Sequence, residues 1–269
     1  MKSIFQINEA AKFVSNRISS APRTGVILGS GLGGLVSALK ESMSIRYADI
    51  PHFPVSTVVG HRGELIVGEL NRVPVWVLNG RFHYYEGYDL DDVVFPLRVL
   101  RALGLERIII TNAAGGLNPS FEAGDIMLIE DIISLMPANP LRGKNLDEFG
   151  PRFPDMSEPF CSTWMKQAIG EAENQNINLR KGTYVGLTGP KLETKAEINY
   201  CRLIGGDAVG MSTVSEVIAA NHMGIKVLGF SVITNESIPK VKKEFTHEEV
   251  VDVANKAGAT LAKLIKRVL

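Results

Sequence analysis

Residues 73–88 read Val-Pro-Val-Trp-Val-Leu-Asn-Gly-Arg-Phe-His-Tyr-Tyr-Glu-Gly-Tyr, an apolar run that turns abruptly into polar side chains. Residues 75–78 are apolar on both faces, which is typical of a strand buried inside a layered α/β domain. Asn79-Gly80 predicts a turn. Arg81 and His83 follow, and in an extended segment residues two apart point the same way. Because ligands of open α/β sheets bind at the carboxyl ends of strands, this pattern predicts a phosphate or carboxylate site; a surface turn with scattered polar groups is the alternative.

Two further apolar segments end in the same manner. Residues 25–34 read Gly-Val-Ile-Leu-Gly-Ser-Gly-Leu-Gly-Gly, which predicts a short buried strand, a glycine-rich turn carrying Ser30 and a helix to about Lys40. Residues 107–111 predict another buried strand, and a glycine-containing turn is expected over residues 112–119. Purely structural turns have no reason to repeat this pattern, so we expect the three strand ends to converge on one site.

The glycine-rich turn also fits a dinucleotide-binding pattern. Gly29, Gly31 and Gly34 are in Gly-x-Gly-x-x-Gly register, and Asp49 follows at about the 20-residue distance expected of a ribose-binding acid. An NAD-linked oxidoreductase is therefore an alternative. The prolines that follow Asp49 argue against it, because they make this segment a loop and not the end of a second parallel strand.

Length and composition predict one globular domain over residues 1–269. A chain of 269 residues is near the upper size for a single hydrophobic core, and no Pro/Ser-rich or highly charged linker divides it. With 45% hydrophobic and 22% charged residues the composition is that of a globular protein. The 29 basic and 29 acidic residues balance, which argues against a nucleic-acid polymer as partner. No apolar run reaches membrane-spanning length, so no membrane partner is expected.

Cysteine usage and the N-terminal residues predict a cytoplasmic protein. Cys161 and Cys201 form no disulfide framework, and their surroundings lack the spacing of metal ligands. Small buried thiols in a reducing compartment are the simpler interpretation. Residues 1–12 carry Asn8 and Glu9 where a signal peptide needs an apolar core.

The remaining segments continue the alternation of strands and helices. Residues 64–78 predict a hairpin with its turn at Asn71-Arg72. Residues 136–160 form a long proline-containing loop, which is usually functional or packed on a partner. Glu193 lies at the start of a helix, where a carboxylate is favoured as a capping group. A purely structural capping role is therefore the alternative for Glu193. His222 lies on an apolar helix, and we interpret it, like His52, as structural.

Taken in order, these loops resemble the purine nucleoside phosphorylases of the trimeric type specific for 6-oxopurines. The similarity spans nearly the whole chain. Its motifs are Gly29-Ser-Gly-Leu-Gly33, Gly60-His61, residues 80–87, 111–116 and 152–154, Gly189-Pro190, Leu192-Glu-Thr194, and residues 209–212, 233–235 and 247–249. The resemblance implies a single α/β domain with a mixed, partly barrel-like central sheet flanked by helices. It also implies reversible cleavage of purine ribo- or deoxyribonucleosides by inorganic phosphate, which gives free base and (deoxy)ribose 1-phosphate for purine salvage.

The resemblance assigns residues to each part of such a site. The phosphate positions are Ser30, His61, Arg81, His83, the backbone N–H of Ala113, and Ser212. The ribose positions are Tyr85, Met211 and His247, with Phe153 reaching in from a neighbouring subunit, which implies a homotrimer. The base positions are Ala113, Leu192, Glu193, Val209, Gly210, Met211 and Asn235; at Leu192 many family members carry an aromatic residue. The catalytic positions are His83, Glu193, Asn235 and His247.

The chemistry of such a reaction requires no metal or organic cofactor, because inorganic phosphate is itself the co-substrate. An ionised Glu193 accepts a hydrogen bond from a purine N1–H, and the Asn235 amide can donate to O6. These two residues therefore predict a preference for inosine and guanosine over adenosine, and they argue against the sister activity on methylthioadenosine. Besides the oxidoreductase, a non-catalytic nucleoside-binding protein is an alternative for the whole chain. For Asn235 alone, the alternative role is a structural one, in which its side chain only caps the end of the strand that carries it.

Overall fold

The computed structural model describes residues 2–55, 62–236 and 247–269, and within them nine strands form one mixed sheet. The strands are β1 (Thr24–Ile27), β2 (Lys40–Arg46), β3 (Glu64–Leu70), β4 (Val73–Asn79), β5 (Arg107–Gly116), β6 (Ile126–Ser134), β7 (Leu179–Gly186), β8 (Ala208–Gly210) and β9 (Lys226–Glu236). Their order is β2-β3-β4-β1-β5-β8-β7-β6-β9, and β5 also pairs with β9. This extra pairing closes β5, β8, β7, β6 and β9 into a ring. The expected mixed, partly barrel-like sheet is therefore confirmed.

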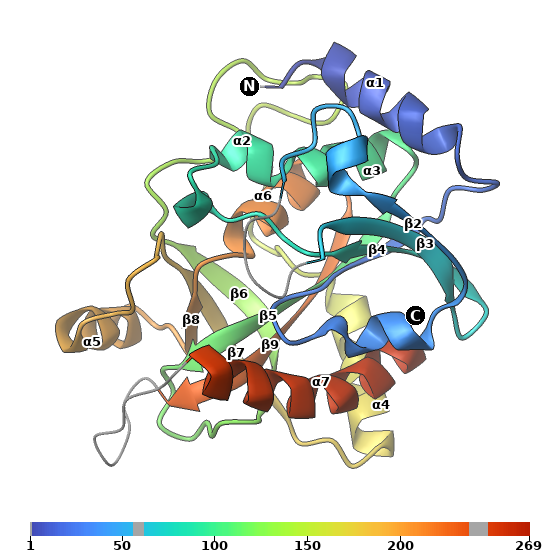
Figure 1. Ribbon diagram of the computed structural model, residues 1–269. Helices are drawn as coiled ribbons and strands as arrows, with labels where there is room; N and C mark the ends of the chain where they lie inside the picture. The colour runs from blue at the N-terminus through green and yellow to red at the C-terminus, as the bar shows by residue number, and fades with distance from the viewer. Residues whose placement is uncertain (1, 56–61, 237–246) are drawn as a thin grey trace.

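Helices cover both faces of the sheet (Figure 1). They are α1 (Ile4–Ser15), α2 (Leu90–Val93), α3 (Phe95–Ala102), α4 (Ser162–Asn174), α5 (Lys195–Leu203), α6 (Val214–His222) and α7 (His247–Val268), with short 3-10 helices η1 (Gly33–Ala38), η2 (Tyr47–Asp49) and η3 (Tyr84–Glu86). One apolar core lies beneath α1, α3 and α6, and a second lies beneath α4 and α7. Among the helices that the structure describes, none has the length and apolar character needed to cross a bilayer.

The predicted hairpin of β3 and β4 is present and sets the position of the organising stretch. The two strands pair antiparallel from Glu64 with Asn79 to Leu70 with Val73. Asn71 and Arg72 between them have φ values of 50° and 67°, as a two-residue turn that matches the twist of its strands requires. The strand β4 is buried from Val75 to Asn79, so the first polar side chains after it emerge inside the molecule.

Four strands run parallel and bring their carboxyl ends to one edge of the sheet. β1 pairs parallel with both β4 and β5, and β5 pairs parallel with β9. Ser30 lies just beyond β1, Arg81 lies just beyond β4, and Asn235 is next to the last residue of β9. Asn112 lies within the longer strand β5, two residues past Ile110, the partner of the last residue of β1. The predicted convergence of strand ends is thus confirmed, and β9 adds a fourth end to it.

Two expectations about local structure were wrong. The helix expected to reach about Lys40 is only the 3-10 helix η1, and β2 begins at Lys40. Gly33 and Gly34 favour helix weakly, whereas pairing with β3 extends the following residues into an edge strand that is mostly exposed. The turn expected over residues 112–119 begins later, because β5 continues to Gly116 by pairing with β8 and β9.

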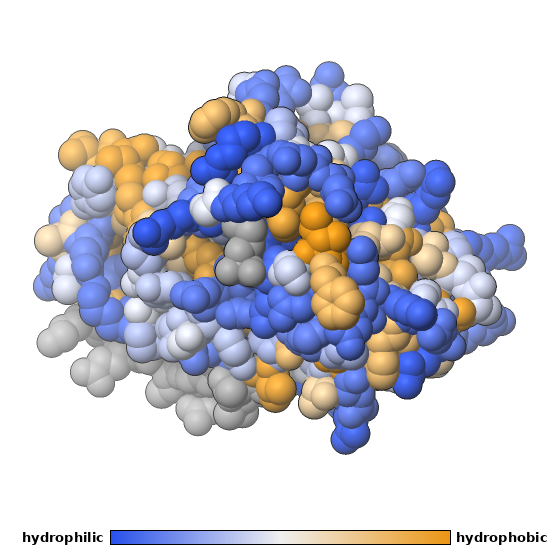
Figure 2. Space-filling view, turned by 90° about the horizontal axis from the view of Figure 1, so that it is seen from above, coloured by the Kyte–Doolittle hydropathy of each residue, from blue (hydrophilic) through white to orange (hydrophobic). Residues whose placement is uncertain are grey.

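The face seen in Figure 2 is mainly hydrophilic, with apolar side chains in small groups among the polar ones. Such a mixture is normal, because globular proteins do not have enough polar surface to cover themselves. The large apolar side chains that are exposed in the described structure include Phe5, Phe153 and Leu192. Two of these three, Phe153 and Leu192, are among the residues that the sequence assigns to a site.

Candidate active site

A cavity of about 200 Å³ lies where the parallel strands end. It is lined by Ser30, Arg81, His83, Tyr85, Asn112, Ala113, Ala114, Gly115, Leu192, Glu193, Val209, Gly210, Met211, Ser212 and Asn235. These residues come from segments spread over most of the chain, and they include the expected base positions and those expected phosphate positions that lie within the described residues. Within the described residues, the structure therefore brings the two halves of the predicted site into one cavity.

Arg81 is held in a fixed orientation by a buried ion pair with Glu216. Its Nε and Nη2 atoms donate to the two carboxylate oxygens of Glu216, each at 2.9 Å. Its Nη1 atom donates to the backbone oxygen of Thr111, also at 2.9 Å. The side chains of Arg81 and Glu216 are only 2% and 6% exposed. A bidentate pair of this kind fixes the plane of the guanidinium as well as its position, so Arg81 is organised before any ligand arrives.

Glu216 is a residue that the sequence interpretation missed. It lies in the first turn of α6 and is buried among apolar neighbours. A carboxylate in such an environment needs a cation or several hydrogen-bond donors, because removing its charge from water is costly. A single Glu inside the apolar run Val214-Ser-Glu-Val-Ile was the available signal, although it could not have identified Arg81 as the partner.

His83 is positioned by its own short 3-10 turn. Glu86 accepts hydrogen bonds from the backbone N–H of His83 at 2.8 Å and contacts its ring Nδ1 at 2.9 Å. The ring also stacks on Tyr85, with centroids 4.6 Å apart and planes 16° apart. Burial, followed by the nearby Glu86 charge, raises the pKa of Tyr85 to about 12. Tyr85 therefore stays protonated near neutral pH and can donate a hydrogen bond.

The glycine-rich turn brings Ser30 against β5. A Cβ atom on Gly29 would lie 2.7 Å from the Cα of Asn112 and 2.9 Å from the backbone oxygen of Thr111. Gly29 N–H also donates to Thr111 Oγ1 at 3.2 Å. Only glycine permits this approach, which places Ser30 beside Asn112 and Ala113 in the cavity wall.

The structure argues against the dinucleotide-binding alternative. The turn leads into the short 3-10 helix η1, so the α-helix whose N-terminus would hold a pyrophosphate is not formed there. Asp49 lies in η2, and its two carboxylate oxygens each accept a hydrogen bond from Arg46 at 2.9 Å. The Asp49 carboxylate is thus paired with Arg46 at the surface, and Asp49 does not lie at the end of a parallel strand.

Glu193 is not the cap of α5. The capping residue is Thr194, whose side chain accepts from the backbone N–H of Glu197 while Glu197 bonds back to the backbone N–H of Thr194. Glu193 instead lines the cavity, and burial raises the pKa of its carboxyl. The capping alternative for Glu193 is therefore excluded.

Asn235 and the β8 segment form the wall next to Glu193. Asn235 lies inside β9, and its Oδ1 is 3.1 Å from Thr234 Oγ1, whose single hydrogen is shared between this oxygen and the Ala114 backbone oxygen at 3.3 Å. Val209, Gly210 and Met211 pass along the same cavity, followed by Ser212. A Cβ atom on Gly210 would lie 2.3 Å from the phenol oxygen of Tyr184, so this wall is packed closely against β7.

Three assigned residues lie apart from the cavity or outside the description. Phe153 is 87% exposed, on a loop tied down by a hydrogen bond from Arg152 Nη1 to the backbone oxygen of Leu141 at 2.8 Å. His247 begins α7, but its side chain is outside the described structure. His61 lies outside the described residues altogether. His52 and His222 make polar contacts within the fold, with Glu9 and Asn145 respectively, as expected for structural residues.

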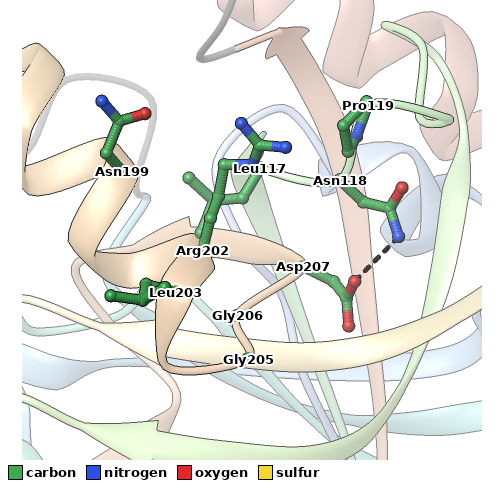
Figure 3. Close-up of a pocket in the computed structure, with 9 residues that line it drawn as sticks. All are labelled: Leu117, Asn118, Pro119, Asn199, Arg202, Leu203, Gly205, Gly206 and Asp207. Atoms are coloured by element: carbon green, nitrogen blue, oxygen red, sulfur yellow. Dashed lines mark hydrogen bonds between the residues drawn. The ribbon is translucent and has the colours of Figure 1, made fainter.

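A wider groove of about 430 Å³ lies elsewhere, between α5 and the loop after β5 (Figure 3). Asp207 on its floor is occupied by Asn118 Nδ2 at 2.8 Å and by the backbone N–H of Thr183 at 2.9 Å. Figure 3 shows Arg202 and Asn199 along the other side of this groove. Of the four converging strand ends, the lining of this groove includes only that of β5, at Leu117, whereas residues at or beyond all four strands line the smaller cavity. Across the described residues, no cluster of three or more metal-binding side chains is present.

The fold and cavity together define an α/β protein with a polar ligand site at the carboxyl ends of parallel strands. The profile of the phosphorylase superfamily matches residues 23–269. Purine nucleoside phosphorylase 1 of Geobacillus stearothermophilus is 48% identical over 263 residues, which cover 98% of this chain and 96% of that protein. The Bos taurus purine nucleoside phosphorylase is 47% identical, covering 96% and 91%. The chain therefore belongs to the phosphorylase superfamily and, within it, to the purine nucleoside phosphorylases.

Solved structures agree with this assignment. The Schistosoma mansoni purine nucleoside phosphorylase in complex with adenosine superposes with a TM-score of 0.93 at 37% identity and covers 99% of this chain and 96% of its own. Isoform 2 of the purine nucleoside phosphorylase from the same organism, in complex with cytosine and ribose-1-phosphate, superposes with a TM-score of 0.94 at 38% identity and the same coverage. The predicted family and fold class are thus confirmed.

The Arg81–Glu216 pair generates a prediction about stability. Replacing Glu216 by Ala leaves a buried guanidinium without its counter-ion, which should lower the free energy of unfolding by about 3–5 kcal/mol. Glu130 is a matched control, because its pair with Lys181 is 3.7 Å long and largely exposed; Glu130→Ala should cost no more than about 1 kcal/mol. Urea unfolding of both variants measures the difference, and equal losses would contradict the structural role of the pair.

Proposed function

We propose that this chain catalyses the reversible phosphorolysis of purine nucleosides, with a preference for inosine and guanosine, to free base and (deoxy)ribose 1-phosphate. One observation carries the proposal: the buried, preorganised Arg81 lines the same cavity as Glu193 and Asn235. A guanidinium suits phosphate, whereas a carboxylate and an amide side by side suit the hydrogen-bonding edge of a purine. Membership in the purine nucleoside phosphorylases supports the same reaction.

The phosphate half of the cavity supplies donors around an anion. In the proposal Ser30, Arg81, His83, the Ala113 backbone N–H and Ser212 hold the phosphate. Glu216 offsets the charge of Arg81, so the phosphate is bound by oriented donors while its negative charge stays available to the reacting ribose. Because Nδ1 of His83 faces Glu86, Nε2 is the nitrogen through which His83 would meet a phosphate oxygen.

The other half of the cavity acts on the ribose and the leaving base. As the glycosidic bond breaks, the ribose becomes oxocarbenium-like and negative charge builds on the purine. Hydrogen bonds that strengthen with this charge lower the barrier. In the proposal Glu193 accepts from N1–H, Asn235 contacts O6 and N7, and Tyr85, Met211 and His247 hold the ribose. Ala113, Leu192, Val209 and Gly210 form the surface on which the base lies. The reaction uses phosphate as co-substrate and needs no further cofactor.

The test of this reaction is base release from inosine with and without inorganic phosphate. We expect release only with phosphate, and recovery of nucleoside from hypoxanthine and ribose 1-phosphate. A protein that binds inosine without releasing base would instead be a nucleoside-binding protein. Stabilisation against thermal unfolding by NAD, but not by phosphate with hypoxanthine, would support the oxidoreductase.

The proposal also includes a homotrimer in the cytoplasm. Phe153 supports the trimer, because a large aromatic side chain that is 87% exposed on an anchored loop is suited to enter a neighbouring subunit. The two cysteines support the compartment. Cys161 and Cys201 are both unpaired in the described structure, as is usual in reducing surroundings.

A second prediction concerns base choice. Adenine presents a lone pair at N1 and an amino group at C6, which would face the Glu193 carboxylate and the Asn235 NH₂, and mismatched polar groups can reduce kcat/KM by about 10⁴-fold. Asn235→Asp should lower the inosine-to-adenosine ratio of kcat/KM by about tenfold or more, because a carboxylate accepts from the 6-amino group. Asn199→Asp on the exposed side of α5 is the matched control and should leave the ratio unchanged.

The result that would refute this role is an equal ratio in the wild type and in Asn235→Asp, or adenosine as the better wild-type substrate. Loss of stability with an unchanged ratio would indicate that Asn235 only caps its strand. The comparison is made on kcat/KM and not on binding, since the Schistosoma mansoni relative has been crystallised with adenosine.

A third prediction tests the shared site. Phe153→Ala and Glu193→Ala should each be nearly inactive as homotrimers. After mixing and subunit exchange, a Phe153→Ala subunit can receive Phe153 from a Glu193→Ala neighbour, so about a quarter of the sites of a 1:1 mixture should regain activity. Phe5→Ala, at another exposed phenylalanine, is the control and should remain active. Proven subunit exchange without recovery would contradict the shared site.

A further inference from the structure

Thr213, directly after the assigned phosphate residue Ser212, has an unusual backbone conformation. Its φ and ψ are 69° and −53°, and Val214 N–H donates to the Ser212 backbone oxygen across it at 2.7 Å. This is a γ-turn with positive φ, which is rare and strained. For a β-branched residue the conformation is especially unfavourable. The surrounding structure therefore holds Thr213 in this strained conformation, which suggests that the conformation has a function.

Capping of helix α6 is not the function of this conformation. Thr213 occupies the N-cap position of α6, where a threonine side chain ordinarily accepts a backbone hydrogen bond, yet no such bond from α6 reaches it in the described structure. Its hydroxyl instead lies 2.9 Å from Asn112 Nδ2 and 3.1 Å from Ser212 Oγ. The turn thus places the Thr213 hydroxyl between two residues of the cavity wall.

Asn112 sets the donor at one end of this series of hydrogen bonds. An amide NH₂ can only donate, so Thr213 Oγ1 accepts from Asn112 Nδ2 and keeps its own hydrogen, for which Ser212 Oγ is an acceptor at 3.1 Å. The oxygen of the same amide is buried and has no partner among the described residues, although Asn112 is only 1% exposed. A buried acceptor is left unsatisfied, so the amide contributes to this wall through its donor side.

Tyr184 reinforces the same direction from the other side. Its phenol oxygen accepts from the Ser212 backbone N–H at 3.3 Å and lies 3.5 Å from Ser212 Oγ. Burial raises the pKa of this phenol, so it keeps its hydrogen near neutral pH and can direct it to Ser212 Oγ. In the arrangement in which Thr213 and Tyr184 both donate to Ser212 Oγ, the hydrogen of the Ser212 hydroxyl is directed to the cavity that Ser212 lines.

We propose that Thr213 is a positioning residue for phosphate binding: its hydroxyl, oriented by Asn112, holds Ser212 as a hydrogen-bond donor toward the anion. The inference rests on the proposed function, because it takes the bound anion to be the inorganic phosphate of that reaction. It explains why the backbone strain at Thr213 is kept. If the hydrogen bonds among Asn112, Thr213 and Ser212 ran in the opposite direction, Ser212 would turn a lone pair toward a negatively charged ligand. The nucleoside half of the cavity is not involved.

Thr213→Val and Thr213→Ser separate the hydroxyl from the rest of the side chain. Val keeps the β-branched shape at the same positive φ and removes the hydroxyl, whereas Ser keeps the hydroxyl. Thr213→Val should weaken phosphate about five- to tenfold, as expected for one oriented hydrogen bond, both in phosphate KM and in phosphate Kd from titration calorimetry. The nucleoside KM should stay the same, and Thr213→Ser should restore most of the affinity.

Thr24→Val is the matched control. Thr24 is 3% exposed, lies at the start of β1 away from the strand ends, and its hydroxyl accepts from Arg107 Nε at 2.8 Å. It should lose stability but keep phosphate affinity. If Thr213→Val does not fold, Asn112→Ala removes the first donor of the chain and should also weaken phosphate.

The outcomes distinguish this inference from the proposed function. Equal phosphate Kd in the wild type and Thr213→Val, or in the wild type and Asn112→Ala, overturns the inference even if base release depends on phosphate. Thr213→Ser as weak as Thr213→Val also overturns it, because the hydroxyl would then not be the important group. A wild type that binds phosphate but releases no base contradicts the proposed function and leaves the Kd comparison as the test of Thr213. A wild type that binds no phosphate contradicts both.

Discussion

The bidentate ion pair between Arg81 and Glu216 is the interaction on which the arrangement of the cavity depends. It joins the end of β4 to the start of α6, and the third contact of Arg81, with the Thr111 backbone oxygen, adds β5. A guanidinium this deeply buried is tolerated only with a hydrogen-bonded partner of opposite charge. The pair therefore serves both stability and function: it makes the burial of Arg81 possible, and it sets the orientation in which Arg81 meets a ligand.

The sheet provides the second constraint. Four parallel strands deliver Ser30, Arg81, Asn112 and Asn235 to one edge, and β8, which pairs with β5 and β7, brings Val209 and Gly210 to the same cavity. Phosphate groups and base groups can be neighbours because different strands carry them. Close approaches that only glycine permits, as at Gly29 and Gly210, keep the cavity small enough for its donors to act together.

Much of this could be predicted from the sequence, because the signals are local. Buried strands that end in glycine-rich or polar turns are visible within about ten residues, and the resemblance of several loops in order gave the fold class and family. Glu216 was missed because its partner is 135 positions away. The strand β2 was missed because an exposed edge strand has a polar pattern that resembles a loop. The conformation of Thr213 had no signal, since a threonine with positive φ contradicts the local preference of its residue type.

The most direct test of the central claim is the affinity of inorganic phosphate for Arg81→Lys, measured by titration calorimetry beside the wild type. Lys keeps the positive charge but cannot make the paired contacts of a guanidinium. If preorganised geometry and not charge holds the anion, phosphate Kd should rise by about tenfold or more, while the affinity for hypoxanthine stays within about twofold, because Glu193 and Asn235 are untouched. An unchanged phosphate Kd in Arg81→Lys would contradict the account.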